Sequence, residues 1–200
     1  SYTLLLDNKA NPQIEEFKKD IDNFKKELHE AFDETYGVLD YLIFMYEDEI
    51  ELLDQLWALI NMIDADFMMI WNMRFDIPFI IDRYRVLGVD PAERMCNKNF
   101  KRKDLYFFTD KTDKKRKIDV ANRGDYCHIS SRTVFYDQMV LYAGLRKGRS
   151  MLRSNKLTYI AHEEIQDEKL DYSEDADLKH LPYVNYKKFV MYNIKDVLLL

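Results

Sequence analysis

Apolar residues near the start of the chain change from a strand-like run to a helical spacing. Residues 2–6 form a short apolar run, which predicts a strand. After Asn11 and Pro12, apolar side chains recur every three or four positions, which predicts one amphipathic helix that ends at Gly37. Asn11 is suited to cap this helix and Pro12 to occupy its first turn. The apolar positions of the helix are Ile14, Phe17, Ile21, Phe24, Leu28 and Phe32.

The remaining chain alternates between short apolar runs and helical stripes. Strands are predicted at 38–46, 66–71 and 132–136, and helices from Glu47, at 78–87, 139–145, 157–164 and 184–200. Strands followed by helices through most of the chain favour an α/β layered domain with a partly parallel sheet. A length of 200 residues fits a single globular domain that spans residues 1–200.

A basic segment interrupts this alternation. Residues 98–117 hold nine Lys or Arg and three Asp, so the segment carries +6 while the rest of the chain sums to −12. Apolar residues at 105–108 and 118–120 predict a hairpin inserted at about 98–120, with its tip at 109–117. The tip could be a solvated loop above core aromatics, or its cations could contact a DNA backbone. The cations in question are Lys114, Lys115, Arg116 and Lys117.

Composition excludes several classes of protein. A net charge of −6 argues against a protein that coats a polyanion with its whole surface. The longest apolar runs are far shorter than the roughly 20 residues of a membrane span, so we expect a soluble protein with no membrane partner. Cys96 and Cys127 indicate free thiols in a reducing compartment, with one disulfide as the alternative. The five glycines form no phosphate-binding loop, and the histidines lack zinc-helix spacing.

Polar residues at the ends of apolar elements are the candidates for chemistry. Asn72 and Asp76 follow the strand at 66–71, and ligands of open α/β sheets bind at such strand ends. Asp76 could instead only cap the helix predicted to begin at Pro78. Tyr192 and Asp196 are four positions apart in the last helix, which places both on one face.

Together these residues resemble motifs of a known family. The second exonuclease motif of the 3′-to-5′ proofreading domain of family B DNA polymerases resembles Asn72, Phe75 and Asp76, which follow an apolar strand. The third motif of that domain resembles Tyr192 and Asp196, about 120 residues later. The resemblance covers roughly residues 38–200. Further similar segments are F-D-I-P-F-I-I-D-R at 75–83, Asp137-Gln138-Met139, residues 157–161 and Lys169.

The resemblance implies a fold, a cofactor and partners. The fold would be that of the DEDDy exonucleases, a ribonuclease-H-like mixed sheet flanked by helices. The cofactor would be Mg²⁺ or Mn²⁺ in a two-metal site for phosphodiester hydrolysis. The partners would be the single-stranded 3′ end of DNA and the remainder of the polymerase chain. We expect the protein in the cytoplasm, where DNA replicates, as in a phage protein acting in its host cell.

The resemblance also implies a role for each matching residue. Asp76 and Asp196 would be metal ligands, and Tyr192 would orient the nucleophilic water. Asn72 and Phe75 would shape the site around the terminal nucleotide. Lys169 would lie near the scissile phosphate. Asp76, Tyr192 and Asp196 would be the catalytic set.

One departure from the family is informative. The family's first motif is Asp-x-Glu at the end of the first strand, and this pattern is absent from the sequence. Asp7 ends the strand at 2–6 but is followed by Asn8 and Lys9, and a lysine would repel a metal. We therefore expect the first motif to lie upstream, and the chain not to be a competent exonuclease by itself. A non-catalytic DNA-binding or structural module and a free-standing DEDDy exonuclease acting on DNA or RNA are the alternatives.

Overall fold

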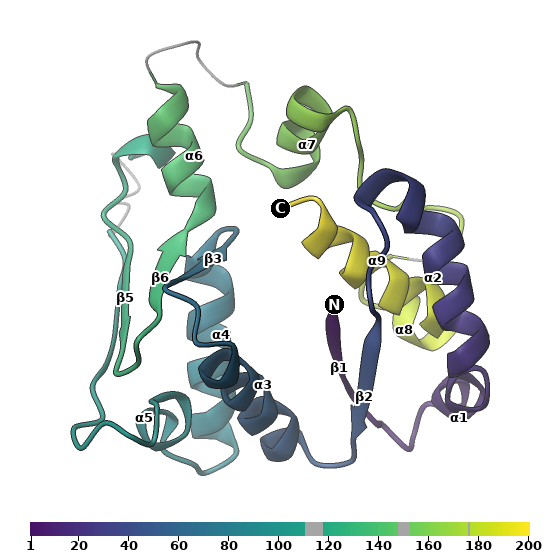
Figure 1. Ribbon diagram of the computed structural model, residues 1–200, viewed down its shortest axis with the longest axis horizontal. Helices are drawn as coiled ribbons and strands as arrows, with labels where there is room; N and C mark the ends of the chain where they lie inside the picture. Colours follow the sequence, from purple (N-terminus) through teal and green to yellow (C-terminus); the bar gives the residue numbers. More distant parts are fainter. Residues whose placement is uncertain (111–117, 148–152, 176) are drawn as a thin grey trace. The chain divides into compact units, whose positions relative to one another are not determined.

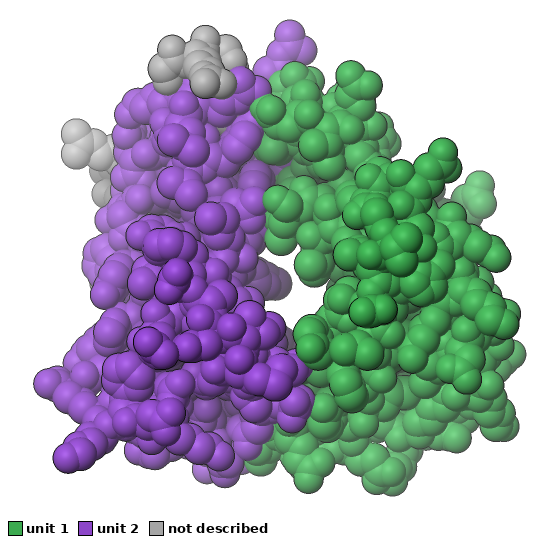
Figure 2. Space-filling view, viewed as in Figure 1, with its two compact units in different colours: residues 1–52, 157–200 green, residues 53–156 purple. Residues whose placement is uncertain are grey.

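The computed structural model describes residues 1–110, 118–147, 153–175 and 177–200 (Figure 1). The chain divides into two compact units, coloured separately in Figure 2. Unit 1 contains residues 1–52 and 157–200, and unit 2 contains residues 53–156. Both units contain helices and strands, so the chain is a mixed α/β protein. Within its described part, no helix has both the length and the apolar character that crossing a membrane requires.

Unit 1 is built on a parallel pair of strands. Its elements are β1 (Tyr2–Leu6), α1 (Pro12–Lys19), α2 (Ile21–Tyr36), β2 (Leu42–Tyr46), the start of α3 (Glu49–Ile63), α7 (Leu157–Ile165), α8 (Leu181–Val184) and α9 (Tyr186–Leu198). In the parallel pair, Tyr2 lies opposite Leu42 and Leu6 lies opposite Tyr46. The predicted strand at 2–6 is confirmed, and the strand predicted at 38–46 is shorter than expected.

The core of unit 1 joins segments from both ends of the sequence. Leu5 of β1, Phe17 of α1, Leu28 of α2 and Val190 of α9 belong to one buried cluster. Full burial of each such side chain contributes roughly 1.5–3 kcal/mol. This packing fixes α9, which carries two of the predicted catalytic residues, against the N-terminal helices.

The helix predicted from Pro12 to Gly37 is two helices, α1 and α2. Its predicted ends are confirmed, because the Asn11 side chain accepts a hydrogen bond from the backbone N–H of Gln13 and Gly37 follows the last turn with φ of 80°. The helix is interrupted at Asp20, whose backbone N–H donates a hydrogen bond to the Phe17 carbonyl at 3.0 Å. The apolar spacing runs unbroken through this point, so periodicity could not reveal the break. The last helix, predicted at 184–200, begins at Tyr186, and Asn185 separates it from the short helix α8.

Unit 2 contains a parallel and an antiparallel strand pair. Its elements are the remainder of α3, β3 (Phe67–Ile70), α4 (Met73–Val86), α5 (Pro91–Met95), β4 (Leu105–Phe108), the 3₁₀ turn η1 (Val120–Asn122), β5 (Tyr126–Ile129), β6 (Val134–Asp137) and α6 (Gln138–Arg146). β3 pairs with β6 in parallel, and β4 pairs with β5 in an antiparallel ladder. Cys96 and Cys127 are free thiols, as predicted, and both are buried. Burial raises the pKa of Cys127 to about 12.

The basic segment differs from its prediction. The prediction of a return strand at 118–120 is wrong. The 3₁₀ turn begins at Val120, and the strand that pairs with β4 is β5. The Asp119 side chain accepts from the backbone N–H of Ala121 and caps this turn. Residues 111–117, which make up most of the predicted tip and include Lys114, Lys115, Arg116 and Lys117, lie outside the described residues.

Helix α4 begins earlier than predicted. It starts at Met73 rather than Pro78, so Pro78 lies inside the helix. Proline normally marks a first turn, where its missing N–H costs nothing. Here Pro78 leaves the carbonyl of Arg74 without its helical donor. The consequence for the site is that Phe75 and Asp76 lie on the first turn of a helix, and only Trp71 and Asn72 separate that helix from β3.

Candidate functional site

In unit 2, the two parallel strands end beside each other. Ile70, the last residue of β3, lies opposite Asp137, the last residue of β6. The carboxyl ends of parallel strands form the edge at which ligands bind in open α/β sheets. Asn72 and Asp76 follow this edge, and with Asp137 they form a group that we name the Asp76 cluster.

Asp137 connects the strand edge to two helices. Its side chain is buried, and Oδ1 accepts hydrogen bonds from the backbone N–H groups of Asn72 at 3.2 Å, Met139 at 3.0 Å and Val140 at 3.3 Å. Burial raises the pKa of Asp137, although these backbone bonds act in the opposite direction. Its Oδ2 is buried and has no hydrogen-bond partner within the described residues. The sequence resemblance included Asp137 but gave it no role, although an Asp directly before a helical stripe indicates a helix cap.

Asn72 forms the turn between β3 and α4. Its backbone is left-handed, with φ of 60° and ψ of 54°, a conformation that asparagine tolerates better than most residues. The hydrogen bond from its N–H to Asp137 holds this turn. Phe75 then projects from the helix with its side chain mostly exposed, and Asp76 is partly buried. Burial and the negative charge of Asp137 raise the pKa of Asp76.

The first turn of α4 is held by a buried ion pair. Arg74 Nε lies 3.0 Å from Asp125 Oδ2, and Arg74 Nη2 lies 2.5 Å from Asp125 Oδ1. The Asp125 side chain is 0% exposed, so this carboxylate depends on Arg74 for its neutralisation. Arg74 is therefore committed to Asp125. Among the described residues, no cation forms an ion pair with Asp76 or Asp137.

In unit 1, α9 presents Tyr192 and Asp196 to a single lysine. Lys169 Nζ lies 2.6 Å from Asp196 Oδ2 and 3.2 Å from the Tyr192 hydroxyl, so both side chains are on one helix face, as their spacing predicts. We name these three residues the Lys169 cluster. The ammonium also lies 5.3 Å from the centre of the Tyr192 ring, and the Tyr172 ring packs edge-on at 5.1 Å.

The Lys169 cluster is balanced in charge. Burial lowers the pKa of Lys169, but the bonds to Asp196 and Tyr192 outweigh it and leave that pKa above its ordinary value. The pKa of Tyr192 is also above its ordinary value, in this case because burial disfavours the charged phenolate. Asp196 Oδ1 is buried without a partner in the described part of the chain. An open pocket of about 460 Å³ adjoins the cluster, and its lining includes Thr158, Glu168, Lys169, Tyr172, Ser173 and Tyr192.

Asp7, the residue nearest in position to the family's first motif, is also neutralised. Its side chain is almost fully buried, and Lys18 Nζ lies 2.5 Å from Asp7 Oδ2. Lys9, which the sequence places beside Asp7, pairs with Glu47 at 2.7 Å on the surface instead. The cation that neutralises Asp7 therefore comes from α1 rather than from the adjacent residues.

The donor chemistry suits a hard divalent cation at both clusters. The Asp76 side chain is partly buried near the charge of Asp137, and Asp196 Oδ1 has no hydrogen-bond partner within the described residues. Carboxylate oxygens are the ligands that Mg²⁺ and Mn²⁺ prefer. Across the described residues, no group of three or more His, Cys, Asp or Glu side chains is gathered to hold a metal. Asp76 belongs to unit 2 and Asp196 to unit 1.

One family model matches the chain. Its description is "DNA polymerase family B, exonuclease domain", and it matches residues 7–137. The matched range contains Asn72, Phe75, Asp76 and Asp137, and it ends before the Lys169 cluster. No curated protein matches the chain significantly.

Proposed function

The chain belongs to the exonuclease-domain family of family B DNA polymerases, and we propose that Asp76, Tyr192 and Asp196 perform its chemistry. Its function in the parent polymerase is 3′-to-5′ proofreading, a hydrolysis of the terminal phosphodiester bond of DNA. Exonuclease domains of this family generally use divalent metals. The observation that carries the residue assignment is Asp76, an ion-pair-free carboxylate beside a second buried carboxylate at the end of parallel strands.

Asp76 and Asp196 are the proposed metal ligands. Two carboxylates that face each other without a cation repel, and this repulsion contributes to the raised pKa of Asp76 beside Asp137. A divalent metal, when bound, lowers the pKa of a water molecule and stabilises negative charge on the phosphoryl oxygens. Asp196 contributes an oxygen that has no protein partner among the described residues, while its other oxygen stays on Lys169.

Tyr192 is the proposed orienting group for the nucleophilic water. The Tyr192 hydroxyl accepts a hydrogen bond from Lys169. Burial raises the pKa of this hydroxyl further above neutral pH, so the phenol is protonated at pH 7. A protonated phenol positions water by hydrogen bonding without adding a negative charge next to phosphate. Lys169, which fixes both Tyr192 and Asp196, is the proposed cation near the scissile phosphate.

Asn72 and Phe75 are proposed to hold the terminal nucleotide. The Phe75 ring is 69% exposed, which leaves an aromatic surface available beside Asp76 on the same helical turn. The single-stranded 3′ end of DNA is the proposed substrate, and the remainder of the polymerase chain the proposed partner. We also propose the ribonuclease-H-like arrangement of the sheet with an inserted hairpin, and a cytoplasmic site of action where DNA replicates.

A second candidate is a non-catalytic DNA-binding module of the same family. The observation that favours it is the sequence after Asp7, which continues with Asn8 and Lys9 instead of the pattern Asp-x-Glu.

A 3′-end digestion assay tests the proposal. The parent polymerase is incubated with 5′-labelled single-stranded DNA and Mn²⁺, with a 3′-blocked oligonucleotide as the substrate control. We expect products that shorten stepwise from the 3′ end, and their loss in Asp76→Asn and with EDTA. Digestion that is unchanged in Asp76→Asn would overturn the residue assignment. The absence of any digestion by a folded wild-type protein would favour the non-catalytic module.

A further inference from the structure

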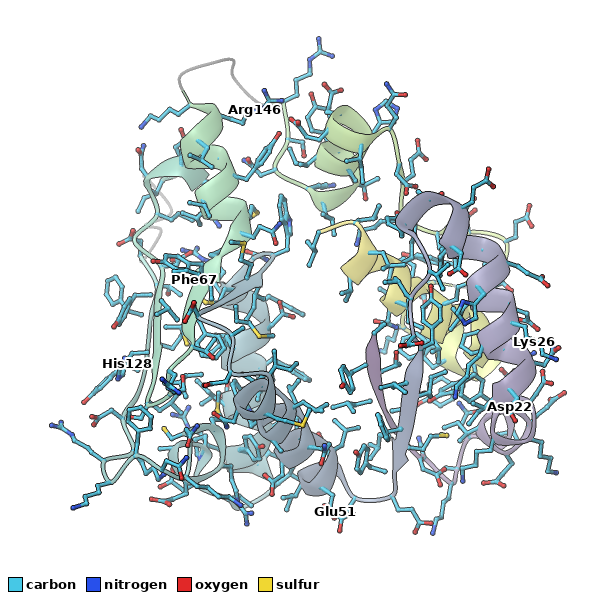
Figure 3. The ribbon with its side chains drawn as sticks, in the orientation of Figure 1. Asp22, Lys26, Glu51, Phe67, His128 and Arg146 are labelled. Atoms are coloured by element: carbon cyan, nitrogen blue, oxygen red, sulfur yellow. The ribbon has the colours of Figure 1, made fainter. Side chains whose placement is uncertain are left out.

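The β4–β5 ladder carries aromatic rings on one of its two faces. Tyr106 lies opposite His128, and Phe108 lies opposite Tyr126, so the four side chains share a face. We name these four residues the aromatic face; His128 is labelled on β5 in Figure 3. Tyr106 and Tyr126 each lie near the His128 ring, at 6.1 Å and 6.5 Å between centres, and the Tyr126 ring is nearly parallel to it.

This face is exposed although the ladder has a buried side. Tyr106, Phe108 and Tyr126 are 54%, 55% and 55% exposed. The alternate positions of β5, Cys127 and Ile129, are buried, so the ladder already packs its other face against unit 2. Three half-exposed aromatic rings on one small surface are typical of a binding site rather than of a solvated strand pair.

Exposed cations come shortly before the aromatic face in the chain. Lys98, Lys101 and Arg102 precede β4 and are exposed. The Arg102 guanidinium pairs with Asp104, the residue before β4, at 2.8 Å, and interactions with Asp104 and then with Tyr106 raise its pKa. Exposed rings beside exposed cations match a ligand that has both flat apolar groups and negative charge. Single-stranded nucleic acid has this composition.

We propose that the aromatic face binds single-stranded DNA by stacking of unpaired bases on Tyr106, Phe108 and Tyr126. The choice of DNA rests on the proposed function. In a duplex the faces of the bases are already stacked, so only unpaired bases can use the rings. The neighbouring cations contribute attraction to the phosphates, which is independent of the bases. The face therefore recognises bases, a role distinct from backbone contact by the basic segment.

The test compares two probes that share a backbone. Binding of the chain to a fluorescent oligothymidylate and to an abasic oligonucleotide of equal length is followed by anisotropy in EDTA. We expect the wild type to prefer the oligothymidylate, and each of Tyr106→Leu and Tyr126→Leu to weaken its binding about tenfold while leaving the salt dependence unchanged. Tyr183→Leu is the control, because Tyr183 is 58% exposed on α8 in unit 1.

The outcomes separate this proposal from the proposed function. Equal affinity for the two probes, or unchanged affinity in both leucine variants, overturns the proposal that the aromatic face binds DNA bases. This holds even if Asp76→Asn abolishes digestion and the exonuclease assignment stands. Base-dependent binding that is lost in the leucine variants supports the proposal, even if the parent polymerase fails to digest DNA. Equal weakening by Tyr183→Leu overturns it too, because the effect is then not confined to this surface.

Discussion

The Asp76 cluster and the Lys169 cluster contain the same kind of groups but differ in their balance of charge. In the Lys169 cluster, an ammonium contacts the carboxylate at 2.6 Å. In the Asp76 cluster, the negative charge of Asp137 contributes to the raised pKa of Asp76, and Arg74 of the same helix is bound to Asp125. The difference is that an ammonium group neutralises the carboxylate of the Lys169 cluster, whereas no ion pair among the described residues neutralises the carboxylates of the Asp76 cluster. If both clusters bind metal as proposed, the loss of a carboxylate should therefore affect metal binding more at Asp76 than at Asp196.

The largest expected effect concerns the framework of the Asp76 cluster. Arg74→Gln leaves the Asp125 carboxylate unpaired at a position that is 0% exposed, so we expect a loss of about 3–5 kcal/mol in the free energy of unfolding. Urea denaturation measures this loss. The control is Arg85→Gln on the same helix, whose exposed pair with Asp82 is worth about 0–1 kcal/mol. Adding Asp125→Asn to Arg74→Gln should restore much of the stability; no restoration would contradict the interpretation of a buried pair.

The next largest effect is on digestion by the parent polymerase. Asp76→Asn should lower the rate of 3′-end digestion by on the order of 100-fold or more, because an amide is a poor metal ligand. Lys169→Met should lower it less, because it removes a group that positions Tyr192 and Asp196 rather than a ligand. Single-turnover rates on labelled DNA measure both. Asp82→Asn, an exposed acid on the same helix, should have no effect, and an equal loss in all three variants would point to unfolding instead.

A smaller effect should have opposite signs in the two clusters. Without metal at pH 7, Asp76→Asn should stabilise the chain by about 1 kcal/mol, because burial and Asp137 disfavour the charged carboxylate. Lys169→Met should destabilise it by about 1–3 kcal/mol, because Asp196 loses its charged partner. Urea denaturation in EDTA gives both values. Two changes of the same sign would remove the contrast between the clusters.

The smallest effect concerns the turn that places Asp76. Asn72→Ala should cost about 1 kcal/mol, because alanine disfavours the left-handed backbone, whereas Asn72→Gly should cost little. If the Asn72 side chain contacts the terminal nucleotide, both variants should lose digestion to a similar extent. Thermal melting and digestion, measured on the same samples, separate the backbone from the side chain. Full activity in Asn72→Gly would contradict a role for the side chain.

Local sequence patterns predicted most element types but not every boundary. The cap at Asn11 and the end at Gly37 were predicted because capping chemistry acts within a few residues. The break at Asp20 was missed because the apolar stripe continues across it. The start of α4 was misplaced because Pro78 is normally a first-turn residue, and here it lies within the helix.

The residues of the candidate site have signals in the sequence, whereas their interaction partners do not. Asn72, Asp76, Tyr192 and Asp196 have local signals, namely a strand end and a helical spacing. The pairs Arg74–Asp125 and Lys18–Asp7 are made by folding, between residues separated by 51 and 11 positions. A single sequence contains no signal for such pairs, so the unequal charge of the two clusters could be seen only in the structure.

Direct titration of Mn²⁺ tests the central claim most directly. Calorimetry or electron paramagnetic resonance would follow Mn²⁺ binding to the wild-type chain, to Asp76→Asn and to the control Asp82→Asn. We predict that the wild type and Asp82→Asn bind Mn²⁺ alike, and that Asp76→Asn loses affinity at least about tenfold. Binding by Asp76→Asn that equals that of the wild type would contradict the assignment of Asp76 as the metal-dependent residue of this exonuclease domain.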